Sequence, residues 1–114
     1  MIAVIFESWP KPGKMQTYLD MGAALASHLN DLDGFISIER FQSVVDPAKL
    51  VAISFWRDEA AIENWRKNGV HRGIQTKSRE TVFDDYRLRV AAVVRDYGMA
   101  AREQAPADSR DVPC

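Results

Sequence analysis

The sequence predicts an α+β domain of the ferredoxin-like type, with its elements in the order βαββαβ. Two observations carry this prediction. Short apolar runs rich in β-branched residues alternate with stretches whose apolar residues recur every three or four positions. The first pattern is typical of strands, and the second is typical of helices with one apolar face. Two such helices cover one face of an antiparallel sheet.

The first half of the chain contains two predicted strands and a helix. Residues 2–6 read Ile-Ala-Val-Ile-Phe and predict a buried strand, which the Pro-Lys-Pro-Gly segment at 10–13 closes. A helix should follow, with Gly34 as its stop signal. Residues 35–41 then alternate between apolar and polar side chains, which predicts the second strand. The apolar stripe of the helix consists of Met15, Leu19, Gly22, Leu25, Leu29 and Leu32.

The second half supplies the remaining elements. The run LVAISFW at residues 50–56 predicts the third strand. Asp58 should cap a second helix that includes Trp65, because an Asp side chain accepts hydrogen bonds from the free N–H groups of a first turn. The Asn-Gly pair at 68–69 predicts a break in this helix, after which the helix resumes. Residues 82 to about 97 predict a long fourth strand.

Length and composition indicate a single domain followed by a tail. The chain has 114 residues, of which 46% are hydrophobic and 27% charged, and this is enough for one core. We expect the domain to occupy residues 1–98. Residues 99–114 are polar and show no periodicity, so we expect a tail that is disordered or lies on a partner's surface.

Charge and cysteine content exclude several classes of function. The chain has fifteen Lys and Arg residues and sixteen Asp and Glu residues. It therefore lacks the excess of basic residues that is typical of a nucleic-acid binder or of a protein held on an acidic membrane. The single cysteine is Cys114, so the chain cannot form an internal disulfide. No apolar run is long enough to span a bilayer. We therefore expect a soluble cytoplasmic protein without nucleic-acid or membrane partners.

The first, third and fourth predicted strands are apolar on both faces, although two helices can cover only one face of the sheet. In the first strand, Ile2, Val4 and Phe6 face one way, while Ala3 and Ile5 face the other. An apolar face exposed on that scale needs a second cover. We expect a homodimer that packs sheet against sheet, with the long fourth strand reaching the partner.

Few residues stand out as candidates for chemistry, because the sequence contains no phosphate-binding glycine loop, metal-type Cys/His cluster or Ser/His/Asp signature. His71 follows the predicted helix break and could bind iron or act as a base, although an exposed histidine is the simpler interpretation. In an unbroken helix, His71 would point about 120° away from Trp65, so the break is needed for both to face one pocket. Aromatic walls suit a flat apolar ligand, and core packing is the competing interpretation. The aromatic set is Phe6, Trp9, Phe55, Trp56 and Trp65.

An arginine group is the other candidate feature. Guanidinium groups bind carboxylates through paired hydrogen bonds, as the propionates of a haem would require. Arginines on a strand are more often solvated or engaged in ion pairs across a dimer. The group comprises Arg66, Arg72, Arg79, Arg87, Arg89 and Arg95.

Several segments resemble the antibiotic biosynthesis monooxygenase family. They are GFISIERF at 34–41, SFWRDEA at 54–60, the pairs Trp65-Arg66 and His71-Arg72, and YRLRV at 86–90. The resemblance covers about residues 1–98 and implies a dimeric α+β barrel.

Within that family, the chain is most similar to bacterial haem-degrading monooxygenases of the IsdG and HmuQ/HmuD type. This resemblance implies that His71 ligates the haem iron and that Trp65 packs against the distorted macrocycle. In this haem interpretation, one or more of Arg66, Arg72, Arg87 and Arg89 bind the propionates, and Phe6 contributes to the haem site. Haem would be both substrate and cofactor, and O2 with electrons from an external donor would open the porphyrin ring and release iron.

Two other functions stay open. A cofactor-free oxygenase of the same family would act on an electron-rich phenol or quinol, with His71 or Glu7 as the base. A non-catalytic dimeric protein that binds a small molecule is the alternative outside enzymology. It is favoured because Glu7 occupies the region where the haem-degrading relatives have an asparagine, and because no second polar group lies at a catalytic spacing.

Overall fold

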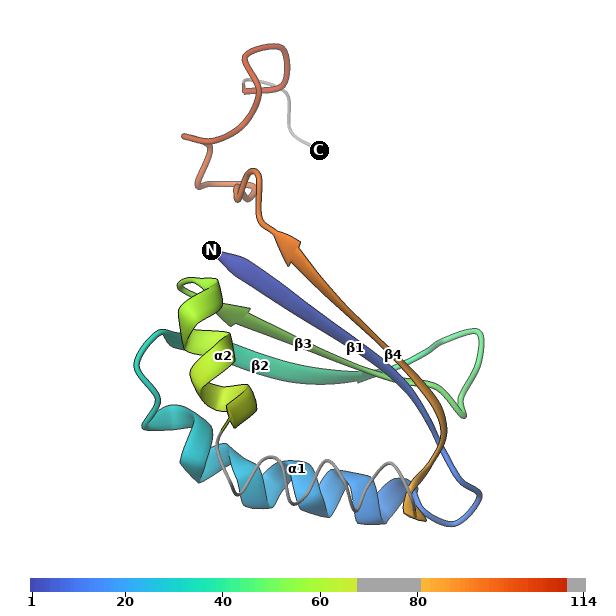
Figure 1. Ribbon diagram of the computed structural model, residues 1–114. Coiled ribbons are helices and arrows are strands. Elements are labelled where there is room, and N and C mark those ends of the chain that lie inside the picture. Colours follow the sequence, from blue (N-terminus) through green and yellow to red (C-terminus); the bar gives the residue numbers. More distant parts are fainter. Residues whose placement is uncertain (68–80, 111–114) are drawn as a thin grey trace.

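The computed structural model describes residues 1–67 and 81–110, and it confirms the ferredoxin-like α+β fold. The two helices lie on the same face of a curved four-stranded sheet (Figure 1). Residues 93–110 extend beyond the end of the last strand, away from the helices. The elements are β1 (Ile2–Pro10), α1 (Met15–Asn30), β2 (Phe35–Gln42), β3 (Leu50–Trp56), α2 (Glu59–Lys67) and β4 (Phe83–Ala92).

The sheet has the strand order β2-β3-β1-β4, and all neighbouring strands are antiparallel. β1 lies inside the sheet, with Val4 paired to Ser54 of β3 on one side and to Val90 of β4 on the other. This register places alternate residues of all four strands on the face that the helices cover. The functional site is built on that face.

The apolar stripe of α1 follows the predicted residues except at Leu19, whose buried position Tyr18 takes. Tyr18, Gly22 and Leu29 are buried, whereas Leu19 is 37% exposed. The stripe therefore runs through Tyr18, Gly22, Leu25 and Leu29, in steps of four, three and four residues. The aromatic ring of Tyr18 takes the buried position because it packs on the rings that project from the sheet.

α1 ends at Asn30, four residues before the predicted stop signal. Gly34 instead forms the turn into β2, with a φ of 86° that a side chain would strain. Its carbonyl accepts a hydrogen bond from the backbone N–H of Arg57 at 2.7 Å. A Cβ atom at this position would lie 2.6 Å from the Cβ of Ala61, so the turn packs directly against α2.

α2 begins where the sequence predicts. Oδ1 of Asp58 accepts a hydrogen bond from the backbone N–H of Ala61 at 2.9 Å, and Oδ2 accepts one from Nε of Arg57 at 3.1 Å. These hydrogen bonds, the backbone one first, hold the pKa of Asp58 below its ordinary value of 3.8. The predicted break at 68–69 lies outside the described residues.

Asp58→Asn should make the stability less dependent on pH, because asparagine keeps the capping oxygen and loses only the charge. With its folded-state pKa lowered, ionised Asp58 stabilises the fold above the ordinary value of 3.8, and this contribution is lost as the pH falls through the folded value. We expect the wild type to melt at a higher temperature at pH 7, and the two proteins to converge once the pH has fallen below the folded-state pKa of Asp58. Thermal melts across this range measure the effect, and a difference independent of pH would contradict it.

β4 is shorter than predicted at its C-terminal end. It stops at Ala92, which pairs with Ile2, and the N–H of Val93 then bonds to the carbonyl of Met1 at 3.0 Å. The prediction of a strand to residue 97 is wrong because β1 offers no further residue with which to pair. At the other end of the sheet, β1 continues to Pro10, past the predicted end at residue 6, since β4 pairs along its whole length.

The described part of the tail forms turns around Arg102. Its guanidinium donates hydrogen bonds to the carbonyls of Gly98, Ser109 and Arg110, and lies 5.3 Å from the ring centroid of Tyr97. Residues up to 110 therefore adopt a defined conformation, and contact with a partner stays a prediction. Within the described residues, no helix is both long and apolar enough to cross a membrane.

The face of the sheet opposite the helices is uncovered in a single chain (Figure 1). It is largely apolar, as the sequence predicts, and the ring of Phe41 is 45% exposed there. The homodimer that would cover this face stays a prediction. Its apolar residues are Ala3, Ile5, Phe41, Val51, Ile53, Phe55 and Ala91.

Candidate functional site

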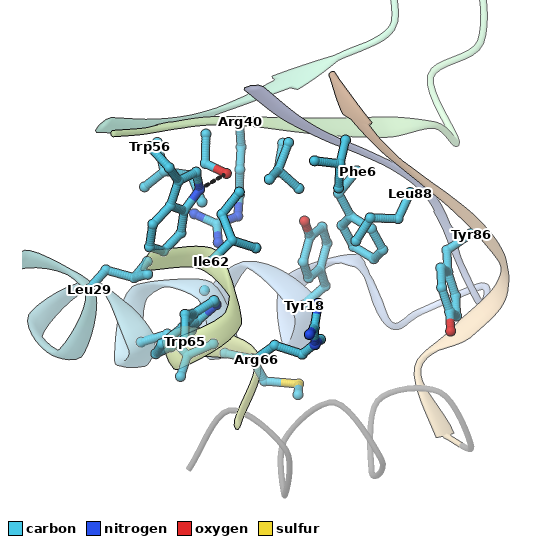
Figure 2. Close-up of a pocket in the computed structure, with 18 of the residues that line it drawn as sticks. Phe6, Tyr18, Leu29, Arg40, Trp56, Ile62, Trp65, Arg66, Tyr86 and Leu88 are labelled. Atoms are coloured by element: carbon cyan, nitrogen blue, oxygen red, sulfur yellow. Dashed lines mark hydrogen bonds between the residues drawn. The ribbon is translucent and has the colours of Figure 1, made fainter. Parts of the chain in front are cut away.

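A cavity of about 260 Å³ lies between the sheet and the helices, and Figure 2 shows side chains from both layers pointing into it. The core is divided into two clusters. One is centred on Trp56 and Trp65, and the other on Tyr18, Leu50 and Val82. Residues of both clusters line the cavity, so the space between them is the part of the interior that packing leaves unfilled.

The wall of the cavity is mostly apolar. All four strands contribute side chains from the helix-covered face, and both helices contribute as well. A wall of this kind binds ligands mainly through buried apolar area, and a small number of polar groups fix their orientation. The aliphatic part of the wall includes Val4, Ile38, Ala52, Ile62, Leu88 and Val90.

An aromatic group forms one end of this wall. The ring of Phe6 lies 6.4 Å from Tyr18, 5.6 Å from Phe83 and 5.5 Å from Tyr86, measured between centroids. In these edge-to-face and tilted contacts the rings pack on one another and form a continuous aromatic wall. Phe6 is in the lining, as expected for a ligand-binding residue, and so are Tyr18 and Tyr86, which were not among the predicted site residues.

Trp56 forms the opposite end and is only 2% exposed. Its indole Nε1 donates a hydrogen bond to Oγ of Ser54 at 2.9 Å, shown as a dashed line in Figure 2. This bond satisfies the buried indole, and the Ser54 side chain also lines the cavity. Trp56 is therefore a rigid part of the wall as well as of the core.

Arg40 brings a positive charge into the apolar lining. Its Cζ atom lies 5.7 Å from the ring centroid of Tyr18, and its buried Nε has no hydrogen-bond partner in the described part of the chain. Arg40 was not among the predicted site residues, although the alternation of β2 places it on the same face as Ile38. A cation on the apolar face of a strand was the signal that could have identified it.

Two of the predicted site residues on α2 line the cavity. Trp65 is 8% exposed and Arg66 is its neighbour in the lining. His71 and Arg72 lie outside the described residues, so their roles stay predictions. The described residues contain no group of three or more His, Cys, Asp or Glu side chains that could hold a metal ion.

Glu7 points away from the cavity, and its proposed role as a base there is wrong. Its carboxylate accepts hydrogen bonds from Nζ of Lys49 at 3.3 Å and from Nη1 of Arg89 at 3.0 Å. These bonds, that from Lys49 first, lower the pKa of Glu7 and keep it ionised. The register places Arg87 on the same uncovered face, so neither strand-four arginine can meet a ligand in the cavity.

The remaining aromatic candidates also lie elsewhere. Nε1 of Trp9 donates a hydrogen bond to Oδ2 of Asp46 at 3.3 Å, and Nζ of Lys49 lies 5.2 Å from the Trp9 ring centroid. Phe55 pairs with Ala3 on the uncovered face. Of the five aromatic candidates, only Phe6, Trp56 and Trp65 line the cavity in the described structure.

Comparison with known proteins gives a consistent family. Residues 1–77 match the model of the antibiotic biosynthesis monooxygenase family. A jasmonate monooxygenase from Pyricularia oryzae is 42% identical over 93 residues, which are 82% of this chain and 43% of that protein. An uncharacterised Bacillus subtilis protein, YqjZ, is 29% identical over 93 residues, covering 82% of this chain and 79% of that protein. The chain thus spans less than half the length of the Pyricularia relative.

Solved structures share the fold. Rv0793 from Mycobacterium tuberculosis has a TM-score of 0.76 at 20% identity, covering 85% of this chain and 98% of that one. A Deinococcus radiodurans protein described as a putative antibiotic biosynthesis monooxygenase has a TM-score of 0.77 at 8% identity, covering 86% and 97%. The family match covers most of the domain and agrees with the observed order of strands and helices. The chain therefore belongs to the antibiotic biosynthesis monooxygenase family.

Proposed function

We propose that this chain is a monooxygenase that oxidises a small electron-rich molecule, a phenol or quinol of one to three rings, inside the cavity. The observation that carries the proposal is the cavity itself, with a volume of about 260 Å³ and a wall that is apolar except for a few polar groups. Small-molecule sites of about 300–1,000 Å³ usually take drug-sized ligands, so a somewhat smaller molecule suits this cavity.

The chemistry of such a substrate needs neither a cofactor nor an external reductant. An ionised phenol is electron-rich enough to pass electrons directly to O2. When the phenol becomes a para-quinone, its ring C–H becomes C=O and its O–H loses hydrogen. One oxygen atom of O2 enters the product, and the other leaves as water with those two hydrogens. The substrate supplies all four electrons.

The residues of the cavity support this reaction in three ways. Most of the wall is apolar, so a ligand that fills the cavity displaces water and thereby strengthens the electrostatic interactions inside. Arg40 and Arg66 favour the anionic form of a bound phenol over its neutral form. The rings of Phe6 and Trp65 offer faces and edges against which a flat molecule can pack. His71 is the candidate base from the sequence, and it lies outside the described residues.

Oxygen uptake with 1,5-dihydroxynaphthalene tests the proposal. We expect O2 consumption, formation of 5-hydroxy-1,4-naphthoquinone, and one labelled atom in the product when ¹⁸O2 is used. Ala52→Leu, which narrows the cavity, should lower kcat/KM by about tenfold or more. The matched variant Val51→Leu changes the neighbouring residue on the uncovered face and should leave the rate unchanged. If oxygen uptake does not exceed that of heat-denatured protein for a panel of phenols and quinols, the proposal fails.

Jasmonate belongs in the same panel because a relative is named for it. Hydroxylation of a C–H bond in this acid consumes two electrons beyond those that the bond supplies, so the assay also contains NADPH with a reductase. Oxygen uptake with jasmonate that requires this reductant would show that the substrate is an aliphatic acid rather than a phenol.

Haem degradation is the second candidate, and it is favoured by Trp65 and Arg66 in the lining. A bound haem would supply the oxygen-activating chemistry, and external electrons would complete it. The described lining residues fit a haem poorly, because they contain no histidine or cysteine and the volume of about 260 Å³ is small for a tetrapyrrole. A haem titration separates the two functions. A shifted Soret band that saturates at one haem per chain and is lost in His71→Ala would favour haem degradation, whereas binding without turnover would favour a non-catalytic role.

A further inference from the structure

Arg40 projects from β2 into the cavity without a counter-ion in the described structure. Its Nε is buried and lacks a hydrogen-bond partner within residues 1–67 and 81–110, and its cation rests on the ring of Tyr18. In Figure 2 the side chain of Arg40 extends from the sheet toward the helices. One of the five N–H donors of the guanidinium is therefore buried without a partner, which is unfavourable in an apolar wall. An apolar side chain would fill this position at lower cost.

The helix that crosses Arg40 leaves space for it. α1 has a glycine at position 22, and a Cβ atom there would lie 2.6 Å from Cζ and 2.7 Å from Nη2 of Arg40. Glycine is unfavourable inside a helix compared with alanine, so Gly22 needs a local reason. Accommodation of the guanidinium supplies that reason.

The electrostatics of the cavity point the same way. The described lining contains two arginines, Arg40 and Arg66, and neither Asp nor Glu. Positive charge in an apolar lining attracts an anion more strongly than the same charge at the surface. The planar fork of an arginine matches a carboxylate through two parallel hydrogen bonds, and it can also donate to a single phenolate oxygen.

We infer that Arg40 binds an anionic oxygen group of the substrate. The ring of Tyr18 positions the guanidinium, and the absence of a side chain at Gly22 leaves room for it. This inference rests on the proposed function, because it concerns the same cavity. The anionic oxygen belongs either to a carboxylate distant from the reacting carbon or to the ionised phenol itself. In both cases Arg40 selects acidic substrates over neutral ones of the same shape.

Two binding measurements on the full chain test this inference. In the first, calorimetry compares 2-naphthoate with 2-naphthamide, which has a similar shape and no charge. We expect the wild type to bind the acid about 10- to 100-fold more tightly than the amide, and Arg40→Met to lose this preference. In the second, absorbance reports the ionisation of bound 2-naphthol. A lower apparent pKa in the wild type than in Arg40→Met identifies the phenolate as the group bound.

Two further variants control for folding and for general charge. Arg89→Met removes an arginine of the uncovered face and should keep the full preference for the acid. Gly22→Ala retains Arg40 but places a methyl group against its Cζ, so the preference should be reduced without loss of the charge. Thermal melts establish that each variant is folded.

The outcomes separate this inference from the proposed function. If wild type binds neither anion in preference to its neutral partner, or if Arg40→Met keeps the preference in both measurements, the inference is overturned. Protein that binds 2-naphthoate through Arg40 but consumes no oxygen would leave the inference standing and refute the proposed function. Protein that oxidises phenols without any dependence on Arg40 would support the proposed function and overturn the inference about Arg40.

Discussion

Replacing Trp56 by alanine should lower the free energy of unfolding by about 3–5 kcal/mol, because a buried tryptophan is lost and the surrounding wall cannot collapse into the space. The side chain is 2% exposed and packs edge-to-face on Phe35 at 5.2 Å, within the cluster that contains Leu29 and Trp65. The substitution also leaves Oγ of Ser54 without its indole donor. Urea unfolding followed by circular dichroism measures the change.

Trp9→Ala is the matched control. Trp9 is half-buried near the β2–β3 loop, where its indole donates to Asp46 and its ring contacts Lys49. Its removal deletes the same number of atoms from a position that can admit water, so the loss should be well below that of Trp56→Ala. Equal losses for the two variants would show that Trp56 does not organise the core.

Gly34→Ala should lower the free energy of unfolding by about 2–5 kcal/mol, as the sum of a backbone and a steric effect. The φ of 86° is unfavourable for any residue with a Cβ atom. In addition, the new methyl group would lie 2.6 Å from the Cβ of Ala61, so α2 would have to move away from the turn. Because α2 contributes Trp65 to the cavity wall, ligand affinity should fall together with stability.

Gly13→Ala separates the two effects. Gly13 has a φ of 80°, close to that of Gly34, but no atom lies within 4 Å of the position that its Cβ would take. Gly13→Ala should therefore show only the backbone effect. We expect its free energy of unfolding to fall by about 1 kcal/mol, because alanine also lowers the entropy of the unfolded chain and so offsets part of the cost. If Gly34→Ala costs no more than Gly13→Ala in chemical denaturation, the contact with Ala61 has no energetic role.

Most of the fold could be predicted because local patterns determine it. The bounds of β3 are those that its apolar run predicts, and the carboxylate of Asp58 caps α2 as its position suggests. Errors arose where tertiary pairing decides the result. β4 ends at Ala92 because its neighbour ends there, and this information lies in another strand rather than in residues 93–97. Similarly, Tyr18 rather than Leu19 is buried in the stripe of α1, because its ring packs on that of Phe6 in the sheet.

The candidate site was only partly predictable, for a different reason. Phe6, Trp65 and Arg66 were identified from residue type and resemblance, and all three line the cavity. Arg40 was overlooked because a lone arginine in an alternating strand looks like a solvated residue until register and burial are known. Glu7 shows the opposite error, since its place near the end of a strand suggested chemistry, whereas ion pairs with Lys49 and Arg89 occupy it.

The central position of β1 has a consequence for how the chain folds. β1 pairs with β3 on one side and with β4 on the other. The second pairing joins residues far apart in the sequence, such as Ile2 and Ala92. Closing so long a loop is slow, because the chain loses conformational entropy before the hydrogen bonds and contacts of the strand pair have formed. Until that closure, the nascent chain carries an apolar strand with one unpaired edge, which is a template for association with other chains. The last strand therefore sets the period during which this domain is vulnerable to aggregation.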